Sequence, residues 1–345
     1  MPGLLSTAYK FMRLRGPTSL FDRAYQVQFE LGATGRPAPL STSGLRVGRD
    51  VCYHPQPDDK GRQQSLDIYA PVDSPVRSDS GAPVLESERG APVFVFMHGG
   101  GWRAADKQDA LGVHSNVCTA LAGRGLLVVN VNYRLSPRVR HPAHALDVAH
   151  ALRWVREHIR DYGGDDGNIF VGGHSSGGHL AALVTLDKQY LRAVGANDDP
   201  DKSAFGAGDH FDKSVGGDFI RGVVGISGIY NLEHFAGRNR LALRLMTRPA
   251  FGARPEEWRA ASPLSHVRAG APPFLMVNAA EDERLEEEAE ELALLLRAAG
   301  TSAETAIIPG TNHFTILGFI GTPDDTLTER IASFVKKNVS KQSAA

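Results

Sequence analysis

Short apolar runs of strand character alternate with segments of helical period along most of this chain, and this alternation limits its fold more than any other feature. The strand candidates are residues 45–53, 65–69, 93–97, 126–131, 169–171, 222–226, 274–278 and 304–308. Helical segments fall between most of them, but none separates the first two. The pattern predicts an α/β fold with an eight-stranded, mostly parallel sheet, helices on both faces and an antiparallel start.

The chain is expected to form one main domain over residues 41–345, preceded by a separate segment over residues 1–40. That segment has an amphipathic helical pattern, which we interpret as part of a cap in preference to a helix lying on a membrane surface. Residues 232–267, between the sixth and seventh strand candidates, are predicted to add the other helices of a small cap. Two polar stretches, 73–92 and 196–218, are predicted to be loops.

The charge balance and the apolar pattern exclude several kinds of partner. The formal net charge is −1, so no basic surface suits a nucleic acid. No run approaches the roughly 18 apolar residues of a membrane-spanning helix, and neither membrane contact nor a secretory signal is expected. Cys52 and Cys118 are expected to be buried free thiols, and the expected location is cytoplasmic. A small molecule is the expected partner, and a homodimer is left open.

The sequence GHSSG at residues 173–177 directly follows a strand candidate and precedes a helix-forming stretch. A sharp turn between strand and helix presents the hydroxyl of its central serine at the edge of the sheet, and the two glycines leave room for the backbone. The helix that follows points its first N–H groups at developing negative charge. The spacing therefore predicts Ser175 as a nucleophile, although a Gly/Ser turn without chemistry produces the same letters.

The sequence HGGGW at residues 98–102 follows the strongly apolar third strand candidate. Successive glycines allow backbone N–H groups to face a ligand without obstruction by side chains. We predict that the N–H groups of Gly100, Gly101 and Ser176 form an oxyanion hole. We expect His98 to brace the loop by hydrogen bonding, with a role as general base as the alternative. Trp102 either lines a substrate pocket or packs beneath the loop.

These two motifs occur together with NYRLSP at residues 132–137 and YGGD at residues 162–165. In combination they resemble the esterase branch of the α/β-hydrolases. HGGGW with a serine motif is similar to the hormone-sensitive-lipase-like carboxylesterases, whereas GHSSGGHLA at residues 173–181 looks closer to kynurenine formamidases and prenylcysteine methylesterases. The resemblance covers roughly residues 46–339 and implies the α/β-hydrolase fold.

The resemblance also implies a catalytic triad in the chain order serine, acid, histidine. It places the acid in the loop after the seventh strand candidate, at Asp282, with Glu281 and Glu283 as alternatives. It places the general base at His313, in the sequence GTNHF that follows the last strand candidate. The neighbouring aromatic ring, Phe314, is a further candidate for the substrate pocket.

The histidines outside these motifs have structural interpretations. His141 and His144 have a loose metal-ligand spacing, but Pro142 between them is typical of the start of a helix. No Cys or carboxylate pair nearby completes a zinc site, so no metal is expected. His174 and His179 flank the nucleophile; we expect packing roles for both, with His174 also a candidate for the pocket wall.

We therefore expect a serine hydrolase that cleaves small to medium carboxylic esters through an acyl-enzyme, without a cofactor. The alternative is an aryl formamidase acting on N-formylkynurenine, because that reaction uses the same groups. A non-catalytic binding protein of the same fold, similar to plant gibberellin receptors, is a remote alternative. Such proteins characteristically lose the histidine, and His313 is present here.

Overall fold

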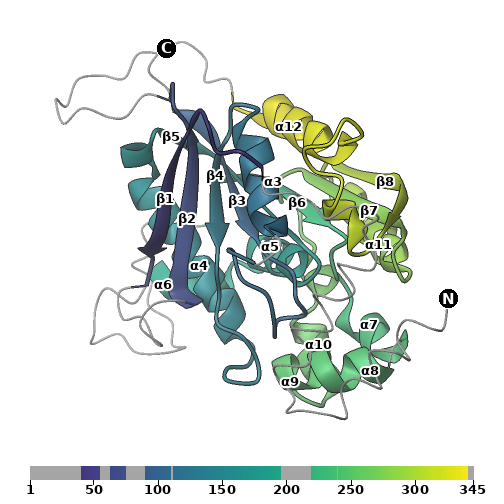
Figure 1. The fold of residues 1–345 in the computed structure, drawn as a ribbon. Coiled ribbons are helices and arrows are strands. Elements are labelled where there is room, and N and C mark those ends of the chain that lie inside the picture. Colours follow the sequence, from purple (N-terminus) through teal and green to yellow (C-terminus); the bar gives the residue numbers. More distant parts are fainter. Residues whose placement is uncertain are drawn as a thin grey trace, which may run out of the picture.

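One sheet of eight strands forms the centre of the molecule, in the order β1-β2-β4-β3-β5-β6-β7-β8 (Figure 1). The computed structural model describes residues 40–54, 63–74, 90–109, 112–195, 219–238 and 240–340. The strands are β1 (Leu45–Cys52), β2 (Ser65–Pro71), β3 (Ala91–Met97), β4 (Leu127–Val131), β5 (Gly164–His174), β6 (Ile220–Ile226), β7 (Phe274–Glu281) and β8 (Ala303–Asn312). All eight predicted strands are therefore confirmed.

The direction of the strands also follows the prediction. β1 pairs antiparallel with β2, and β2 pairs antiparallel with β4, whereas every other neighbouring pair is parallel. A parallel connection requires a long crossover, usually a helix, and in the described residues helices connect the strands only after β3. The carboxyl ends of β3, β5, β6, β7 and β8 consequently lie along one edge, where the predicted motifs meet.

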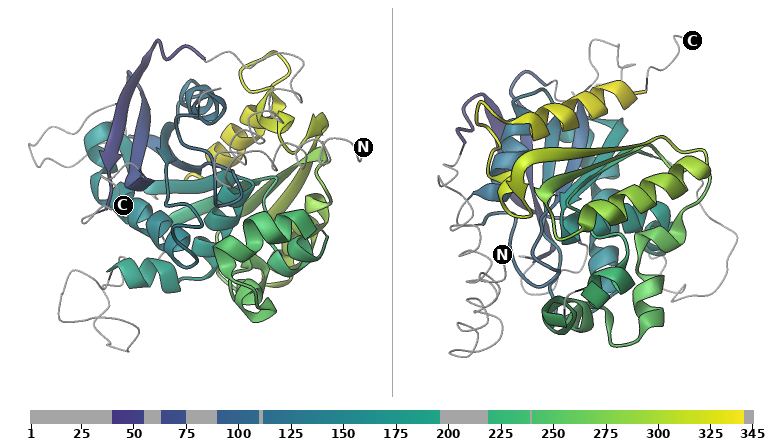
Figure 2. Two further views of the ribbon diagram at one scale, coloured as in Figure 1. Left: turned by 60° about the horizontal axis from the view of Figure 1, so that its bottom comes forward. Right: turned by 90° about the vertical axis from the view of Figure 1, so that its right-hand side faces the viewer.

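Helices cover both faces of the sheet, as the right-hand view of Figure 2 shows for α12 and α11. One face packs against α3 (Val113–Ala122), α12 (Thr326–Asn338) and the 3₁₀ turn η7 (Thr315–Leu317). The other packs against α4 (Ala143–His158), α5 (Ser176–Leu186), α6 (Gln189–Gly195), α11 (Leu285–Ala298) and the 3₁₀ turn η3 (Ile159–Tyr162). β-Branched and aromatic side chains fill both interfaces, which explains the near-continuous apolar runs of the inner strands.

The chain between β6 and β7 forms short helices that gather at one end of the molecule, below the sheet in Figure 1. They are α7 (Leu232–Arg238), α8 (Arg240–Ala242), the π-helical segment η5 (Leu243–Thr247), α9 (Arg248–Phe251), α10 (Pro255–Ala260) and the 3₁₀ turn η6 (Pro263–His266). The helices predicted over 232–267 are therefore present, and their role as a cap stays a prediction. Residues 1–39 of the predicted segment 1–40, residues 75–89 of the predicted loop 73–92, and the whole predicted loop 196–218 lie outside the described residues.

The two cysteines differ in environment. Cys118 is buried in α3, as expected, but Cys52 is exposed at the end of β1, so the prediction of two buried thiols is wrong for Cys52. The reason is the position of β1 at the edge of the sheet, where one flank has no neighbouring strand. In the part of the chain that the structure describes, no helix has the length and apolar character needed to cross a membrane.

Candidate active site

Ser175 occupies a strained turn between β5 and α5. Its backbone has φ 54° and ψ −118°, a conformation that costs a non-glycine residue about 1–3 kcal/mol. The turn is held by the N–H of Ser175, which donates to the carbonyl of Ile226 at 2.8 Å. A Cβ on Gly173 or Gly177 would lie 2.6 or 2.1 Å from the carbonyl oxygen of Met97, so the two glycines permit the close crossing of β3. This is the strand–turn–helix arrangement that GHSSG predicted.

The structure brings together the three residues predicted as the triad. Nε2 of His313 lies 3.0 Å from Oγ of Ser175, and Nδ1 of His313 lies 2.8 Å from Oδ1 of Asp282. Because a carboxylate only accepts hydrogen bonds, Nδ1 carries the proton and Nε2 is free to accept the serine hydroxyl. Glu281 and Glu283 are exposed, whereas Asp282 is buried. The structure therefore selects Asp282 among the three acidic candidates for contact with His313.

Two short loops fix the acid and the base. The second carboxylate oxygen of Asp282 accepts hydrogen bonds from Nδ2 of Asn278 at 2.8 Å and from the N–H of Ala279 at 3.2 Å. Next to His313, Oδ1 of Asn312 accepts the N–H groups of Phe314 and Thr315, each at 3.0 Å. These bonds hold the carboxylate of Asp282 and the backbone that carries His313.

The charges of the acid and the base stabilise each other. Burial alone would raise the pKa of Asp282, but the hydrogen bond and the charge of His313 outweigh it and hold that pKa below its ordinary value. Burial alone would lower the pKa of His313, but the hydrogen bond and the charge of Asp282 leave it above its ordinary value. The arrangement thus favours an ionised carboxylate and stabilises an imidazolium when the histidine takes up a proton.

The glycine loop lies beside this triad. Gly100 and Gly101 follow β3 with φ angles of 109° and 60°. A Cβ on Gly100 would lie 2.2 Å from the carbonyl oxygen of Ala104, so this tight turn admits only glycine. Ser176 is the first residue of α5, and the N–H of a first helical residue has no partner within its helix. The roles of these three N–H groups in an oxyanion hole remain predictions.

His98 braces this loop. It is buried, its Nδ1 donates to the carbonyl of Gly99 at 2.7 Å, and its ring stacks on Tyr133 at 4.5 Å. Burial, with a smaller effect of the charge on His114, lowers the pKa of His98 to about 4. The hydroxyl of Tyr133 donates to the carbonyl of His98 at 3.0 Å. The alternative role of His98 as general base is not supported, because His313 occupies that position.

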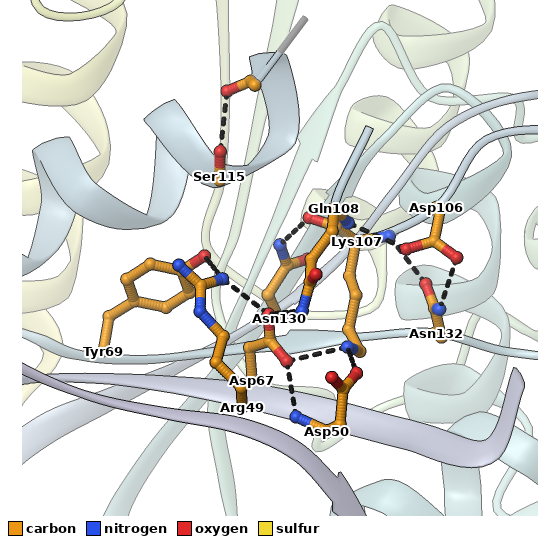
Figure 3. A network of polar contacts seen from close by, with 11 residues as sticks. Arg49, Asp50, Asp67, Tyr69, Asp106, Lys107, Gln108, Ser115, Asn130 and Asn132 are labelled. Atoms are coloured by element: carbon orange, nitrogen blue, oxygen red, sulfur yellow. Dashed lines mark hydrogen bonds and ion pairs between the residues drawn. The ribbon is translucent and has the colours of Figure 1, made fainter. Parts of the chain in front are cut away.

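A buried ion pair anchors the other end of the glycine loop, as Figure 3 shows. Nζ of Lys107 donates to Oδ1 of Asp67 in β2 at 2.7 Å, and both side chains are almost completely buried. The same carboxylate accepts the N–H of Asp50 at 2.9 Å, Nη1 of Arg49 at 2.7 Å and Nε2 of Gln108 at 2.9 Å. Burial alone would raise the pKa of Asp67, but these donors lower it below its ordinary value.

We expect Lys107→Met to lower the free energy of unfolding by about 3 kcal/mol, since it leaves a buried carboxylate without its buried partner. Arg49→Met is the matched control, because the Arg49 side chain is 42% exposed and its loss should cost clearly less. Urea denaturation of both variants measures the difference. Equal losses, or a loss below about 1 kcal/mol for Lys107→Met, would contradict the importance of this pair.

The three predicted pocket residues differ in position. Trp102 is completely buried, donates from Nε1 to Nδ1 of His179 at 3.2 Å and packs edge-on against Phe251. His174 is also completely buried, and its Nε2 donates to the carbonyl of His313 at 2.8 Å. A completely buried side chain has no surface to offer a ligand. We therefore assign Trp102 and His174 to residues that support the site, and not to the pocket wall. Phe314 is half-buried against the ring of His313 and remains a pocket candidate.

The histidine pair considered as metal ligands has other partners. Nε2 of His141 bonds to the hydroxyl of Tyr190 at 3.1 Å, and Nε2 of His144 bonds to Oγ of Ser136 at 3.0 Å. Burial lowers the pKa values of His141 and His144 to about 4 and about 3, so both are neutral at pH 7. Within the described ranges, no three His, Cys, Asp or Glu side chains come together in a group that could hold a metal ion.

Comparison with known proteins identifies the family. The family described as BD-FAE matches residues 82–294, which is more than half of the chain and includes the glycine loop and Ser175. The chain belongs to the BD-FAE family. Esterases LipQ and LipC of Mycobacterium tuberculosis are 29% and 32% identical to this BD-FAE protein over 76% and 72% of its length. It spans 56% of the length of each of them.

Solved structures confirm the fold of this BD-FAE protein. Esterase B of Lactobacillus rhamnosis superposes with a TM-score of 0.66 at 18% identity, covering 97% of this chain and 96% of that one. At this identity the likeness shows the fold alone. The α/β-hydrolase prediction is thus confirmed, and so is the predicted resemblance to its esterase branch.

Some residues that shape the site were not singled out from the sequence. Lys107 is a charged residue in a polar loop, and no local pattern marks it as buried. Tyr133 lies inside the NYRLSP motif, which could have pointed to it. Its hydroxyl contacts the carbonyl of His98 and lies 3.3 Å from Oγ of Ser176. Met246, in the π-helical segment, packs against Gly101, and no pattern in the sequence marked it.

Proposed function

We propose that this protein is a serine hydrolase that cleaves carboxylic esters of small to medium size through an acyl-enzyme. The observation that supports this most strongly is the continuous chain of contacts from Ser175 Oγ through His313 to Asp282, with distances of 3.0 and 2.8 Å. The names of the relatives LipQ and LipC, both esterases, agree with this reaction class. Its partner is a small-molecule ester or amide; a homodimer and a cytoplasmic location stay predictions.

In the first step Oγ of Ser175 attacks the carbonyl carbon of the ester while Nε2 of His313 accepts the hydroxyl proton. Negative charge develops on the carbonyl oxygen. The N–H groups of Gly100, Gly101 and Ser176 stabilise that charge, because they are fixed before the reaction begins. His313 then donates its proton to the leaving alcohol, and the acyl group remains on the serine.

In the second step water attacks the acyl-enzyme by the same path. His313 takes a proton from the water and returns it to Oγ of Ser175 as the acid leaves. Asp282 stays ionised throughout, holds the proton of the histidine on Nδ1 and stabilises the imidazolium. Each step uses only protein groups and water.

We expect kcat/KM to fall as the pH drops through the pKa of His313, because only the neutral imidazole accepts the serine proton. Since Asp282 raises this pKa, the midpoint should lie above the ordinary histidine value of about 6.5. Asp282→Asn should move the midpoint down, because the charge that raises the pKa is gone. A pH profile of kcat/KM for p-nitrophenyl acetate measures both, and a wild-type midpoint below 6.5 would contradict the assigned pairing.

The test of the function is a rate comparison on p-nitrophenyl acetate, butyrate and octanoate and on N-formylkynurenine, with Ser175→Ala as the control. The proposal expects ester cleavage that depends on Ser175. A higher kcat/KM for N-formylkynurenine would instead establish the aryl formamidase. Absence of turnover on the whole panel would contradict the proposed esterase and favour a binding protein.

A further inference from the structure

The segment between β6 and β7 contacts the glycine loop through one side chain in particular. A Cβ on Gly101 would lie 2.9 Å from Sδ, 3.0 Å from Cγ and 3.3 Å from Cε of Met246. The whole outer part of this thioether therefore lies against the Cα of Gly101. In the proposed mechanism Gly101 holds the oxygen of the reacting carbonyl, so Met246 lies beside the carbonyl group of a bound ester.

Local structure on both sides of Met246 keeps it in this place. It belongs to the π-helical segment η5, and such segments are rare and frequently lie at functional sites. Nη1 of Arg103, two residues beyond Gly101, donates to the carbonyl of Leu245, the residue before Met246. The next helix, α9, ends in Phe251, whose ring packs edge-on against Trp102 at 4.8 Å. The glycine loop and this segment are thus held together on either side of Met246.

The exposure of Met246 differs from that of its supports. Trp102 and Thr247 are completely buried, whereas Met246 is only half-buried. A half-buried apolar side chain at the edge of the oxyanion loop has surface left for a ligand. Methionine is unbranched and flexible, and it adapts to groups of different shape within the space it leaves.

The order of the strands indicates which part of an ester reaches Met246. His313 and Asp282 follow β8 and β7, on one side of β5, whereas the glycine loop follows β3, on the other side. The leaving alcohol must lie next to Nε2 of His313, because it receives its proton there. The acyl group is the other substituent of the carbonyl carbon. It therefore extends away from His313, on the side where Met246 lies.

We propose that Met246 is a specificity-determining residue whose side chain limits the length of the acyl group. This inference rests on the proposed esterase function and adds the acyl-chain selection to it. Removing the side chain beyond Cβ opens space beside the carbonyl group. Longer acyl chains then gain apolar contact that the wild-type protein denies them, while acetate gains nothing from the added space.

The test measures kcat/KM for p-nitrophenyl acetate and octanoate and takes their ratio for each variant. We expect Met246→Ala to raise the octanoate-to-acetate ratio by about tenfold or more, the size of effect that one methylene commonly has in a pocket. Met246→Leu is the matched control, because leucine conserves the volume and should keep the wild-type ratio. Met246→Phe should lower the ratio, because the larger side chain leaves less space for the acyl group. It tests the same role of Met246 if the alanine variant does not fold.

A second substrate series separates the acyl side from the alcohol side. It uses methyl, butyl and octyl acetates, in which only the alcohol varies. If the variants change kcat/KM across the alcohol series but not across the acyl series, the assignment of Met246 to the acyl side is overturned. It is also overturned if the wild-type protein cleaves esters but neither Met246→Ala nor Met246→Phe changes the octanoate-to-acetate ratio. Absence of ester cleavage by the wild-type protein would overturn the proposed function itself, and the inference with it.

Discussion

Ser175→Ala is expected to lower kcat on p-nitrophenyl esters by roughly 10⁶-fold while the fold and the stability stay close to those of the wild type. The reason is that Oγ of Ser175 is the atom that forms the acyl-enzyme in the proposed mechanism, and it lies 3.0 Å from Nε2 of His313. Steady-state rates with a circular dichroism spectrum of each protein measure the effect.

Ser176→Ala is the matched control for this variant. Its hydroxyl lies 3.3 Å from that of Tyr133, and its backbone N–H, the group assigned to the oxyanion hole, remains in the alanine protein. It should therefore lose far less activity than Ser175→Ala. Equal losses in the two variants, or undiminished turnover in Ser175→Ala, would show that the nucleophile is misassigned.

The second large effect is expected for Asp282→Asn, which should lower kcat by about 10⁴-fold. An asparagine side chain fills the same space, but its amide neither stabilises the imidazolium nor fixes the proton on Nδ1 of His313. Since Asp282 is buried and receives hydrogen bonds from Asn278 and Ala279, water cannot replace its charge. Rates measured at a pH well above the midpoint of the wild-type profile isolate this effect.

The flanking acids provide the controls for Asp282. Glu281 and Glu283 are exposed. Glu281→Gln and Glu283→Gln should keep nearly all activity, with at most a small shift of the pH profile for Glu283, whose charge contributes to the raised pKa of His313. If either variant loses more activity than Asp282→Asn, the acid of the triad is a different residue.

The strands could be predicted from the sequence because most of them are buried on both faces and read as continuous apolar runs. The ends were less predictable. β5 begins at Gly164, five residues before the predicted run, because Gly164 and Asp165 pair with the first two residues of β3 before an irregularity in the register. A polar stretch at the amino end of a strand lacks the apolar pattern from which strands are predicted, so only the pairing in the folded sheet identifies it as part of the strand.

The candidate site was predictable where the chemistry depends on local sequence. GHSSG and HGGGW each combine a strand end with glycines that a close backbone approach requires, and the structure shows both approaches at Gly177 and Gly100. The acid was less certain because three acidic residues stand in a row. Burial distinguishes Asp282 from its neighbours, and burial is a property of the folded chain.

The supports of the site depend on contacts between distant segments, and these had little signal. Lys107 is buried in its loop because Asp67 of β2, 40 residues earlier in the chain, binds its ammonium group. Met246 lies on Gly101 because a π-helical segment changes the phase of a short helix, and no residue pattern in the sequence indicated that change. The burial of Trp102 and His174 likewise depends on contacts with distant segments, so the sequence left both a pocket role and a packing role open.

The most direct test of the activation of Ser175 is covalent labelling with a fluorophosphonate, which reacts only with an activated serine, followed by mass spectrometry of the tryptic peptides. We predict one labelled residue, Ser175, with the label lost in Ser175→Ala and strongly slowed in His313→Ala. A label on another residue, or a folded wild-type protein that takes up no label, would contradict the claim that Ser175 is an activated nucleophile.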